Sequence, residues 1–370
     1  MRGGPDDVLA EALAFGRFAV GLPRFLRRRM SYDQARTIVA ERIRNRDANF
    51  LVSMERGVFG NPRSPYRAML RLAGCELGDL RRTVSDQGLE GTLRTLRAAG
   101  VYLSFEEFKG YVPIERGGQV IEATRSDFDN PTLRRYYHVT TGGSTGKARR
   151  VLMDLESMAA SLPIRVLSGS HHSVANVPTI RWVDIPPSHG LNAILNDWVC
   201  GNPPVRWFTA VQGGGDGTAV RFRWATAATL AVGRMAGARL PTPEFLPLDQ
   251  AEVIAVAVED LLKRHGRCQV RASVSRLLRI AVAARSRGID LSGAIFHGGG
   301  EPPTPAKVSQ ITASGARFMA SYHFMEAGAV GHGCTTSGVP NDQHLMKDHL
   351  AMIQASRQVP GFDEVVGALC

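Results

Sequence analysis

The sequence predicts an α/β fold, in which the strands of a sheet alternate with helices. From about residue 135, short runs rich in β-branched and aromatic residues alternate with longer runs whose apolar residues recur every three to four positions. The expected strands are residues 136–140, 151–153, 180–185, 294–297 and 317–321. The expected helices between them are residues 249–264, 274–287 and a helix with Thr304 as its N-cap and Pro305 at its first position.

The N-terminal third has a different pattern. Residues 32–44 and 89–99 show helical spacing of apolar side chains, so we expect residues 1–130 to form a mainly helical subdomain. Residues 131–330 form the expected α/β core, and residues 331–370 a short C-terminal β-rich segment. No internal repeat or low-complexity tract interrupts this order.

The composition excludes several classes of protein. The chain has 370 residues, of which 44% are hydrophobic and 21% charged, so a disordered or fibrous protein is not expected. No apolar run reaches the roughly 18 residues of a membrane span, and the N-terminus has no signal-peptide pattern. We therefore expect a cytoplasmic protein.

The net charge of +11 favours anionic ligands. The basic cluster Arg24–Arg29 lacks the interleaved aromatic residues of a single-strand binder, so no nucleic-acid role is expected. The five cysteines form no C-x-x-C pair, which indicates reduced thiols and no zinc site.

A glycine-rich loop between two expected strands has the composition of a phosphate-binding site. Thr141, Gly142, Gly143, Ser144, Thr145, Gly146 and Lys147 combine close backbone approach, hydroxyl donors and one positive charge. The segment is not a Walker A loop, because that pattern requires glycine where Thr141 stands and serine or threonine where Ala148 stands. We expect the loop to join two strands of a hairpin.

Two further segments follow the glycine-rich loop along the chain and belong with it. Gly298, Gly299, Gly300, Glu301 and Pro302 follow one expected strand, and the segment from Tyr322 to Glu326 follows the next. Together with the glycine loop they resemble the core motifs of the adenylate-forming superfamily, which includes acyl-CoA synthetases, peptide-synthetase adenylation domains and luciferases. The phenylacetate-CoA ligase branch is the most similar, and the resemblance covers residues 135–355. It implies the superfamily's N-terminal core, with layered α/β sheets and a small β subdomain.

The resemblance implies a role for each motif residue. The residues from Thr141 to Lys147 would hold the β- and γ-phosphates of ATP, with Lys147 contributing to catalysis. Tyr322 would stack on adenine, Gly299, Gly300, Glu301 and Pro302 would form the opposite wall, and Asp348 would bind the ribose hydroxyls. Glu326 would hold Mg²⁺ and contribute to catalysis. The expected acyl pocket contains Asp184, His189, Trp198, Trp207, Phe296 and His297, whose aromatic side chains favour an aryl acid.

The chain departs from the family pattern in two places. His323 and Met325 stand where the family has glycine and threonine, so His323 is the candidate to replace the missing donor to the α-phosphate. Members of the family continue for roughly a hundred residues past the ribose aspartate into a lid domain, whereas 22 residues follow Asp348 here. We therefore expect no lid, as in the lidless type found in phenazine antibiotic biosynthesis.

These features predict a cytoplasmic ligase of secondary metabolism that uses ATP and Mg²⁺ to convert a carboxylic acid into an acyl-adenylate. A reductase or another acyl-acceptor partner, or a thiol such as that of Cys370, would receive the acyl group. Two alternatives remain open at this point. One is an aryl-CoA ligase core lacking its lid, and the other is an inactive nucleotide- or acyl-binding subunit of a biosynthetic complex.

Overall fold

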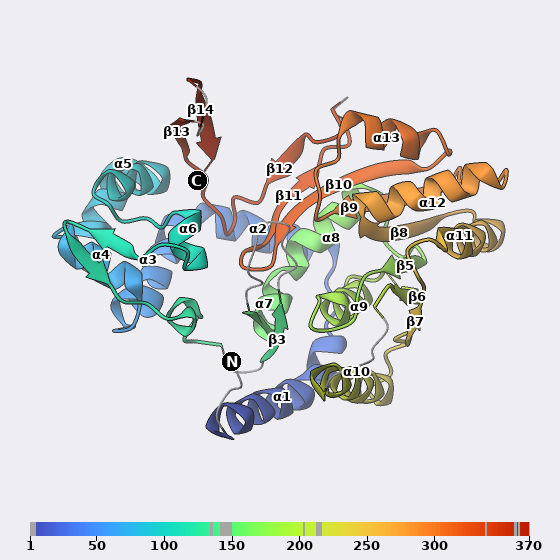
Figure 1. The fold of residues 1–370 in the computed structure, drawn as a ribbon, viewed down its shortest axis with the longest axis horizontal. Coiled ribbons are helices and arrows are strands. Elements are labelled where there is room, and N and C mark those ends of the chain that lie inside the picture. The colour runs from blue at the N-terminus through green and yellow to red at the C-terminus, as the bar shows by residue number, and fades with distance from the viewer. Residues whose placement is uncertain are drawn as a thin grey trace. The chain divides into compact units, whose positions relative to one another are not determined.

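The structure, a computed structural model, describes residues 5–133, 136–140, 150–202, 204–211, 217–336, 339–358, 361 and 363–369. It divides into two compact units (Figure 1). Unit 1 comprises residues 1–38 and 134–346, and unit 2 comprises residues 39–133 and 347–370. The first helix lies in unit 1 because it packs against strands and helices of the α/β core, and residues 331–346 lie there because they contain strands of the main sheet.

Unit 1 holds the α/β core. Its helices are α1 (Pro5–Leu26), α7 (Leu155–Ala160), α8 (Leu162–His171), α9 (Gly190–Val199), α10 (Gly217–Met235), α11 (Ala251–His265), α12 (Val274–Ser286) and α13 (Pro305–Thr312). Its strands are β3 (Tyr136–Thr140), β4 (Arg150–Asp154), β5 (Thr179–Trp182), β6 (Pro204–Thr209), β7 (Pro243–Phe245), β8 (Cys268–Ser273), β9 (Ala294–Gly299), β10 (Arg317–Phe324), β11 (Gly328–Gly333) and β12 (Gln343–Leu345).

The main sheet has the strand order β12-β11-β10-β9-β8-β5-β6-β7. The strands from β10 to β7 in this order are parallel, whereas β11 and β12 are antiparallel to their neighbours. The parallel strands are joined through helices, as such connections require. The predicted α/β fold class is therefore confirmed.

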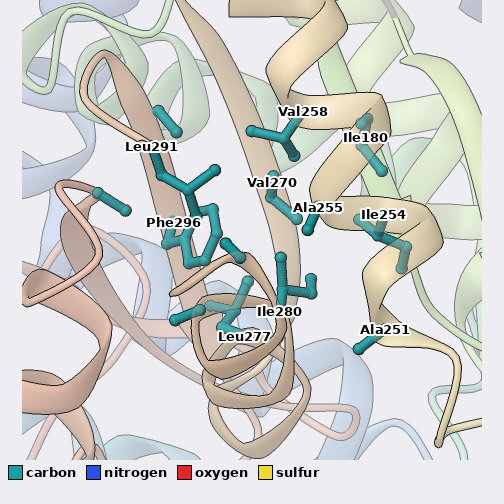
Figure 2. Close-up of a cluster of buried hydrophobic side chains, with 14 of the residues drawn as sticks. Ile180, Ala251, Ile254, Ala255, Val258, Val270, Leu277, Ile280, Leu291 and Phe296 are labelled. Atoms are coloured by element: carbon teal, nitrogen blue, oxygen red, sulfur yellow. The ribbon is translucent and has the colours of Figure 1, made fainter. Parts of the chain in front are cut away.

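One face of this sheet packs against helices α11, α12 and α13. Alternate strand residues such as Ile180, Val270 and Phe296 point to this face and are fully buried. Figure 2 shows the Phe296 ring among side chains that include Leu277 of α12. The other face is covered by a second cluster, to which α1, α7, α9 and α10 contribute.

The glycine-rich loop connects a hairpin, as predicted. Strands β3 and β4 pair antiparallel, with Tyr136 opposite Asp154 and Thr140 opposite Arg150. Residues 141–149 between them lie outside the described residues. The hairpin packs on α1 and α7 through Tyr137 and Val139, which places the two ends of the loop in unit 1.

Unit 2 is mainly helical. It contains α3 (Arg46–Met54), the π-helix η1 (Glu55–Phe59), α4 (Pro65–Leu72), α5 (Leu77–Ala98), α6 (Phe105–Lys109), the 3₁₀-helix η2 (Arg125–Phe128), and the hairpins β1 (Ile114–Arg116) to β2 (Gln119–Ile121) and β13 (Gln354–Gln358) to β14 (Val365–Leu369). Helix α2 (Tyr32–Arg44) spans the boundary after residue 38. The core of unit 2 is a separate apolar cluster that includes Met69, Leu80 and Ile114. None of the helices among the described residues has the length and apolar character needed to span a membrane.

Candidate active site

The order in which the chain adds strands to the main sheet reverses between the neighbouring parallel strands β5 and β8. From β5 the chain continues to β6 and β7 on one side, whereas from β8 it continues to β9 and β10 on the other. Ligands of open α/β sheets bind at such a switch point, outside the carboxyl ends of the strands. An ion pair bridges this point, because Asp184 follows β5 and its Oδ2 lies 2.6 Å from Nη2 of Arg276 on α12.

The turn that follows β5 carries His189 and is tightly packed. A Cβ atom on Gly190 would lie 2.4 Å from the carbonyl oxygen of Asp184 and 2.8 Å from the ring of Trp207, so only glycine fits there. Asp184 also accepts a hydrogen bond from the backbone N–H of Ala210 at 2.9 Å. His189 precedes the first turn of α9 and is thus held at the carboxyl end of β5.

The triple glycine ends β9 beside the next strand. A Cβ atom on Gly299 would lie 2.7 Å from Cε1 of His323, so a side chain at 299 would displace that ring. Gly300 has a φ of +75°, which favours glycine. The carboxylate of Glu301 accepts hydrogen bonds from Ser275 and, at 3.1 Å, from Nζ of Lys307. Glu301 is therefore tied to α12 and α13 at the edge of the expected nucleotide site.

Strand β10 presents Tyr322 and His323 at the same edge. The Tyr322 side chain is 51% exposed and its ring lies 5.9 Å from that of Phe324, so one aromatic surface is open for stacking. The rings of His323 and His189 lie 6.2 Å apart in an edge-to-face arrangement. Burial lowers the pKa of His189 to about 4 and that of His323 to about 3. Both rings are neutral at pH 7, so each has one N–H to donate.

The expected magnesium ligand, Glu326, is exposed in the turn between β10 and β11. Among the described residues, no three histidine, cysteine, aspartate or glutamate side chains form a cluster that could hold a metal ion. Mg²⁺ in nucleotide enzymes keeps several waters and binds one or two carboxylates together with phosphates. A single exposed carboxylate fits that requirement, and bound Mg²⁺ would neutralise phosphate charge there.

The expected ribose ligand, Asp348, belongs to unit 2. Its side chain is 1% exposed, and its oxygens accept from Nη1 of Arg42 at 3.3 Å and Nδ1 of His349 at 2.8 Å. The expected phosphate loop, Thr141 to Lys147, and the expected acyl acceptor Cys370 lie outside the described residues. Their roles, and that of Asp348, stay predictions.

One aromatic residue expected in the acyl pocket lies elsewhere. The Phe296 side chain is fully buried in the core on the side of α11 and α12, whereas its neighbour His297 points to the opposite face of the sheet. Trp198 donates from Nε1 to the carbonyl oxygen of Leu26 at 3.2 Å and stacks with Arg29. The expectation that Phe296 lines the pocket is corrected, because this side chain packs in the core. Trp198 is partly buried against the cluster on the other face of the sheet, and its role in an acyl pocket stays a prediction.

A buried charged cluster near the switch point was missed by the sequence analysis. Arg181 of β5 binds both carboxylate oxygens of Asp197 on α9, one of them at 2.7 Å, and Nη1 of Arg271 on β8 lies 2.7 Å from the same carboxylate. Arg181 and Arg271 stand opposite each other in the parallel register. The available signal was an arginine within each of two short strand segments, TIRW and CQVRAS, but only the sheet order shows that the two meet.

A pair of histidines lies beside this cluster. The rings of His297 on β9 and His332 on β11 are 6.4 Å apart. All four ring nitrogens are buried and have no hydrogen-bond partner within the described part of the chain. Burial lowers the pKa of His297 well below its ordinary value and lowers that of His332 to about 3. Both rings are neutral at pH 7.

The low pKa of His332 predicts a pH-dependent stability. In the unfolded chain its pKa is about 6.5, so below that pH the unfolded state binds more protons than the folded state. The stability contributed by the neutral ring is fully present above about pH 6.5 and is lost as the pH falls toward 3. We expect His332→Asn to reduce the slope of unfolding free energy against pH by up to about 1.4 kcal/mol per unit between about pH 6 and 4. Urea unfolding of both proteins across this range measures the slopes, and equal slopes would contradict the assignment.

Comparison with known proteins found no matching protein-family model and no matching curated protein. Partial matches to solved structures were found. An open 2-hydroxyisobutyryl-CoA ligase bound to 2-HIB-AMP and CoA is 11% identical, with a TM-score of 0.47, and the match covers 85% of this chain and 61% of that chain. An anthranilate CoA ligase bound to anthranoyl-AMP is 11% identical, with a TM-score of 0.35 and coverages of 65% and 37%. A long-chain-fatty-acid-CoA ligase from Archaeoglobus fulgidus is 15% identical, with a TM-score of 0.34 and coverages of 65% and 40%.

By their names, all three of these structures are CoA ligases. The chain spans less than two thirds of the length of each.

Proposed function

We propose that this chain binds ATP and a carboxylic acid and converts them into an acyl-adenylate and pyrophosphate. The observation that carries the proposal is the meeting of separate sequence motifs at one edge of the parallel sheet. His189 after β5 faces His323 on β10, and His323 in turn lies against Gly299 at the end of β9. This edge adjoins the switch point, where open α/β sheets bind nucleotides.

The proposed reaction needs no nucleophilic side chain. A carboxylate oxygen of the acid attacks the α-phosphorus, a new P–O bond forms, and the bond to the leaving pyrophosphate breaks. The protein's part is to position the two reactants and to stabilise charge on the phosphates. Tyr322 would hold adenine, the loop from Thr141 to Lys147 would hold the β- and γ-phosphates, and Glu326 would hold Mg²⁺. Neutral His323 would donate to an oxygen of the α-phosphate.

The proposal also concerns which carboxylic acid is activated and which group receives the acyl moiety. An aryl acid was expected from the aromatic side chains of the six acyl-pocket candidates. The burial of Phe296 in the core with α11 and α12 removes that residue's part of the support. Asp184, His189 and His297 remain as candidates for contact with the acid, and their polar character is compatible with an acid that carries further polar groups. Trp207 is fully buried and donates from Nε1 to the carbonyl oxygen of Val183 at 2.7 Å. The acyl group would pass to a reductase, another partner protein or a thiol.

Pyrophosphate exchange tests the proposal. The purified protein is incubated with MgATP, labelled pyrophosphate and each member of a panel of carboxylic acids, with an acid-free reaction as the control. We expect label to enter ATP only when a suitable acid is present, because exchange requires reversible formation of the adenylate. Failure of every acid to support exchange, while ATP still raises the melting temperature, would instead assign a nucleotide-binding subunit.

A further inference from the structure

The face of the main sheet opposite helices α11, α12 and α13 carries a row of polar side chains. Arg181 on β5, Arg271 on β8 and His297 on β9 stand in register on adjacent parallel strands. Their neighbours in sequence point to the opposite face and form the apolar core with α11 and α12. Parallel strands covered on both faces are normally apolar on both. The row therefore requires a chemical explanation.

The charges in this row do not balance. Arg181 and Arg271 share the single carboxylate of Asp197, whose side chain is fully buried. Arg165 on α8 lies close enough to act electrostatically on both Asp197 and Arg271. Among the described residues, this cluster joins three arginines to one carboxylate, and its histidines are neutral. Burying an uncompensated charge is costly unless a counter-charge joins it.

The neighbouring histidines supply hydrogen-bond donors without partners. His297 is 5% exposed, and neither of its ring nitrogens has a partner among the described residues. The ring nitrogens of His332, on the far side of β10, are in the same state. A neutral imidazole carries one N–H, so the pair offers two donors beside the excess positive charge. Buried polar groups without partners in native proteins call for a ligand, water or ion.

We propose that Arg271, Arg181, His297 and His332 bind a second anionic group on the acid, so that the substrate is a dicarboxylic acid or a carboxylic acid bearing another anion such as phosphate. This inference rests on the proposed function, because it assumes that the first carboxylate reacts near Gly299 and His323. His297 precedes Gly299 by two residues on β9, which corresponds to about 7 Å along the strand. A short aliphatic diacid or a benzene dicarboxylate spans that distance.

Asp197 needs only one of the two arginines as its counter-ion. Arg181 alone gives Asp197 a two-point partner. Arg271 adds a second positive charge to an already satisfied carboxylate, and its pKa is lowered to about 9 by burial and by the nearby Arg181. The energetic cost of holding Arg271 there is recovered when an anion binds.

The primary experiment measures substrate preference by pyrophosphate exchange. Terephthalate is compared with 4-methylbenzoate, and adipate with hexanoate, so that each pair differs in the second carboxylate. A 4-phosphonobenzoate reaction separates a carboxylate requirement from a phosphate requirement. We expect the better dianion of the series to exceed its monoanionic partner in kcat/KM by about 10²-fold, carried mainly by KM. Equal kcat/KM values for the two members of both pairs would overturn the inference and leave the proposed function intact.

Variants link the preference to the cluster. Arg271→Met should reduce the ratio of kcat/KM for the dianion to kcat/KM for the monoanion to a few-fold at most, mainly by raising KM for the dianion. Arg271→Lys should restore part of that ratio. Arg206→Met is the matched control, because Arg206 lies on β6 of the same sheet and pairs with the partly exposed Glu244. His297→Phe, which keeps the ring volume and removes the N–H, should lower the preference about tenfold. A preference that survives both Arg271→Met and His297→Phe would contradict the assignment.

A binding measurement separates this inference from the proposed function. In the absence of ATP, the same dianions should raise the melting temperature of the wild-type protein and of Arg206→Met, but not that of Arg271→Met. This result supports the anion site even if no acid supports exchange. If Arg271 had only a structural role, Arg271→Met would melt at a lower temperature without acid, and the dianions would raise its melting temperature as much as they raise that of the wild type.

Discussion

Replacing Asp197 with asparagine is expected to lower the free energy of unfolding by about 3–5 kcal/mol. Asp197 is fully buried and is the shared partner of Arg181 and Arg271. Asparagine preserves the size of the side chain and removes its charge, so both arginines would remain buried without a counter-charge. Urea unfolding of the wild type and Asp197→Asn at neutral pH measures the difference.

Arg271→Met serves as the matched comparison for Asp197→Asn. It removes a charge from the same cluster but leaves the two-point pair of Arg181 and Asp197 in place. We expect a change of less than about 1 kcal/mol, because the remaining pair is balanced. If Asp197→Asn had as small an effect as Arg271→Met, the buried ion cluster would not have the role assigned to it.

Glu326→Gln is expected to reduce pyrophosphate exchange by about 10²- to 10³-fold, the scale on which loss of one electrostatic stabiliser acts. Glu326 is exposed in the turn after β10, four residues from Tyr322, so its carboxylate is available to a magnesium ion beside the phosphates. Glutamine keeps the length and polarity of the side chain and removes the charge that the metal requires. The rate should recover partially when the magnesium concentration is raised.

Glu122→Gln is the control for that prediction, because Glu122 is an exposed carboxylate of unit 2 that is remote in sequence from the motifs. It should exchange at the wild-type rate, and both variants should unfold at the wild-type urea midpoint. A wild-type exchange rate in Glu326→Gln would remove Glu326 from the proposed site.

Local sequence patterns predicted much of the fold. The strand near residues 294–297 could be predicted because a short apolar run is bounded by glycine, and the helix after it because Thr304 and Pro305 begin a helix. The side chain of Thr304 indeed accepts from the backbone N–H of Lys307. Strand β8 was missed because Gln269 and Arg271 interrupt its apolar residues. Both residues lie on the face of the sheet opposite the core formed with α11 and α12, where Gln269 accepts from Thr179 and Arg271 pairs with Asp197.

The candidate site could be predicted only in part. Motif order identified the loops at the strand ends, including His189, Gly299 and His323, because these residues lie in recognisable local segments. It could not identify the meeting of Arg181, Arg271 and Asp197, which depends on sheet order and on a helix crossing the strands. Adjacent residues of a strand point to opposite faces. That rule alone separates Phe296 from His297, so the error in placing both in one pocket was avoidable.

A crystal structure of the protein with MgATP bound tests the central claim most directly. The account predicts adenine stacked on the ring of Tyr322 and bordered by Gly299 and Gly300, with the triphosphate against the loop from Thr141 to Lys147. A nucleotide bound elsewhere on the chain, with Tyr322 and that loop free of it, would contradict the proposed function.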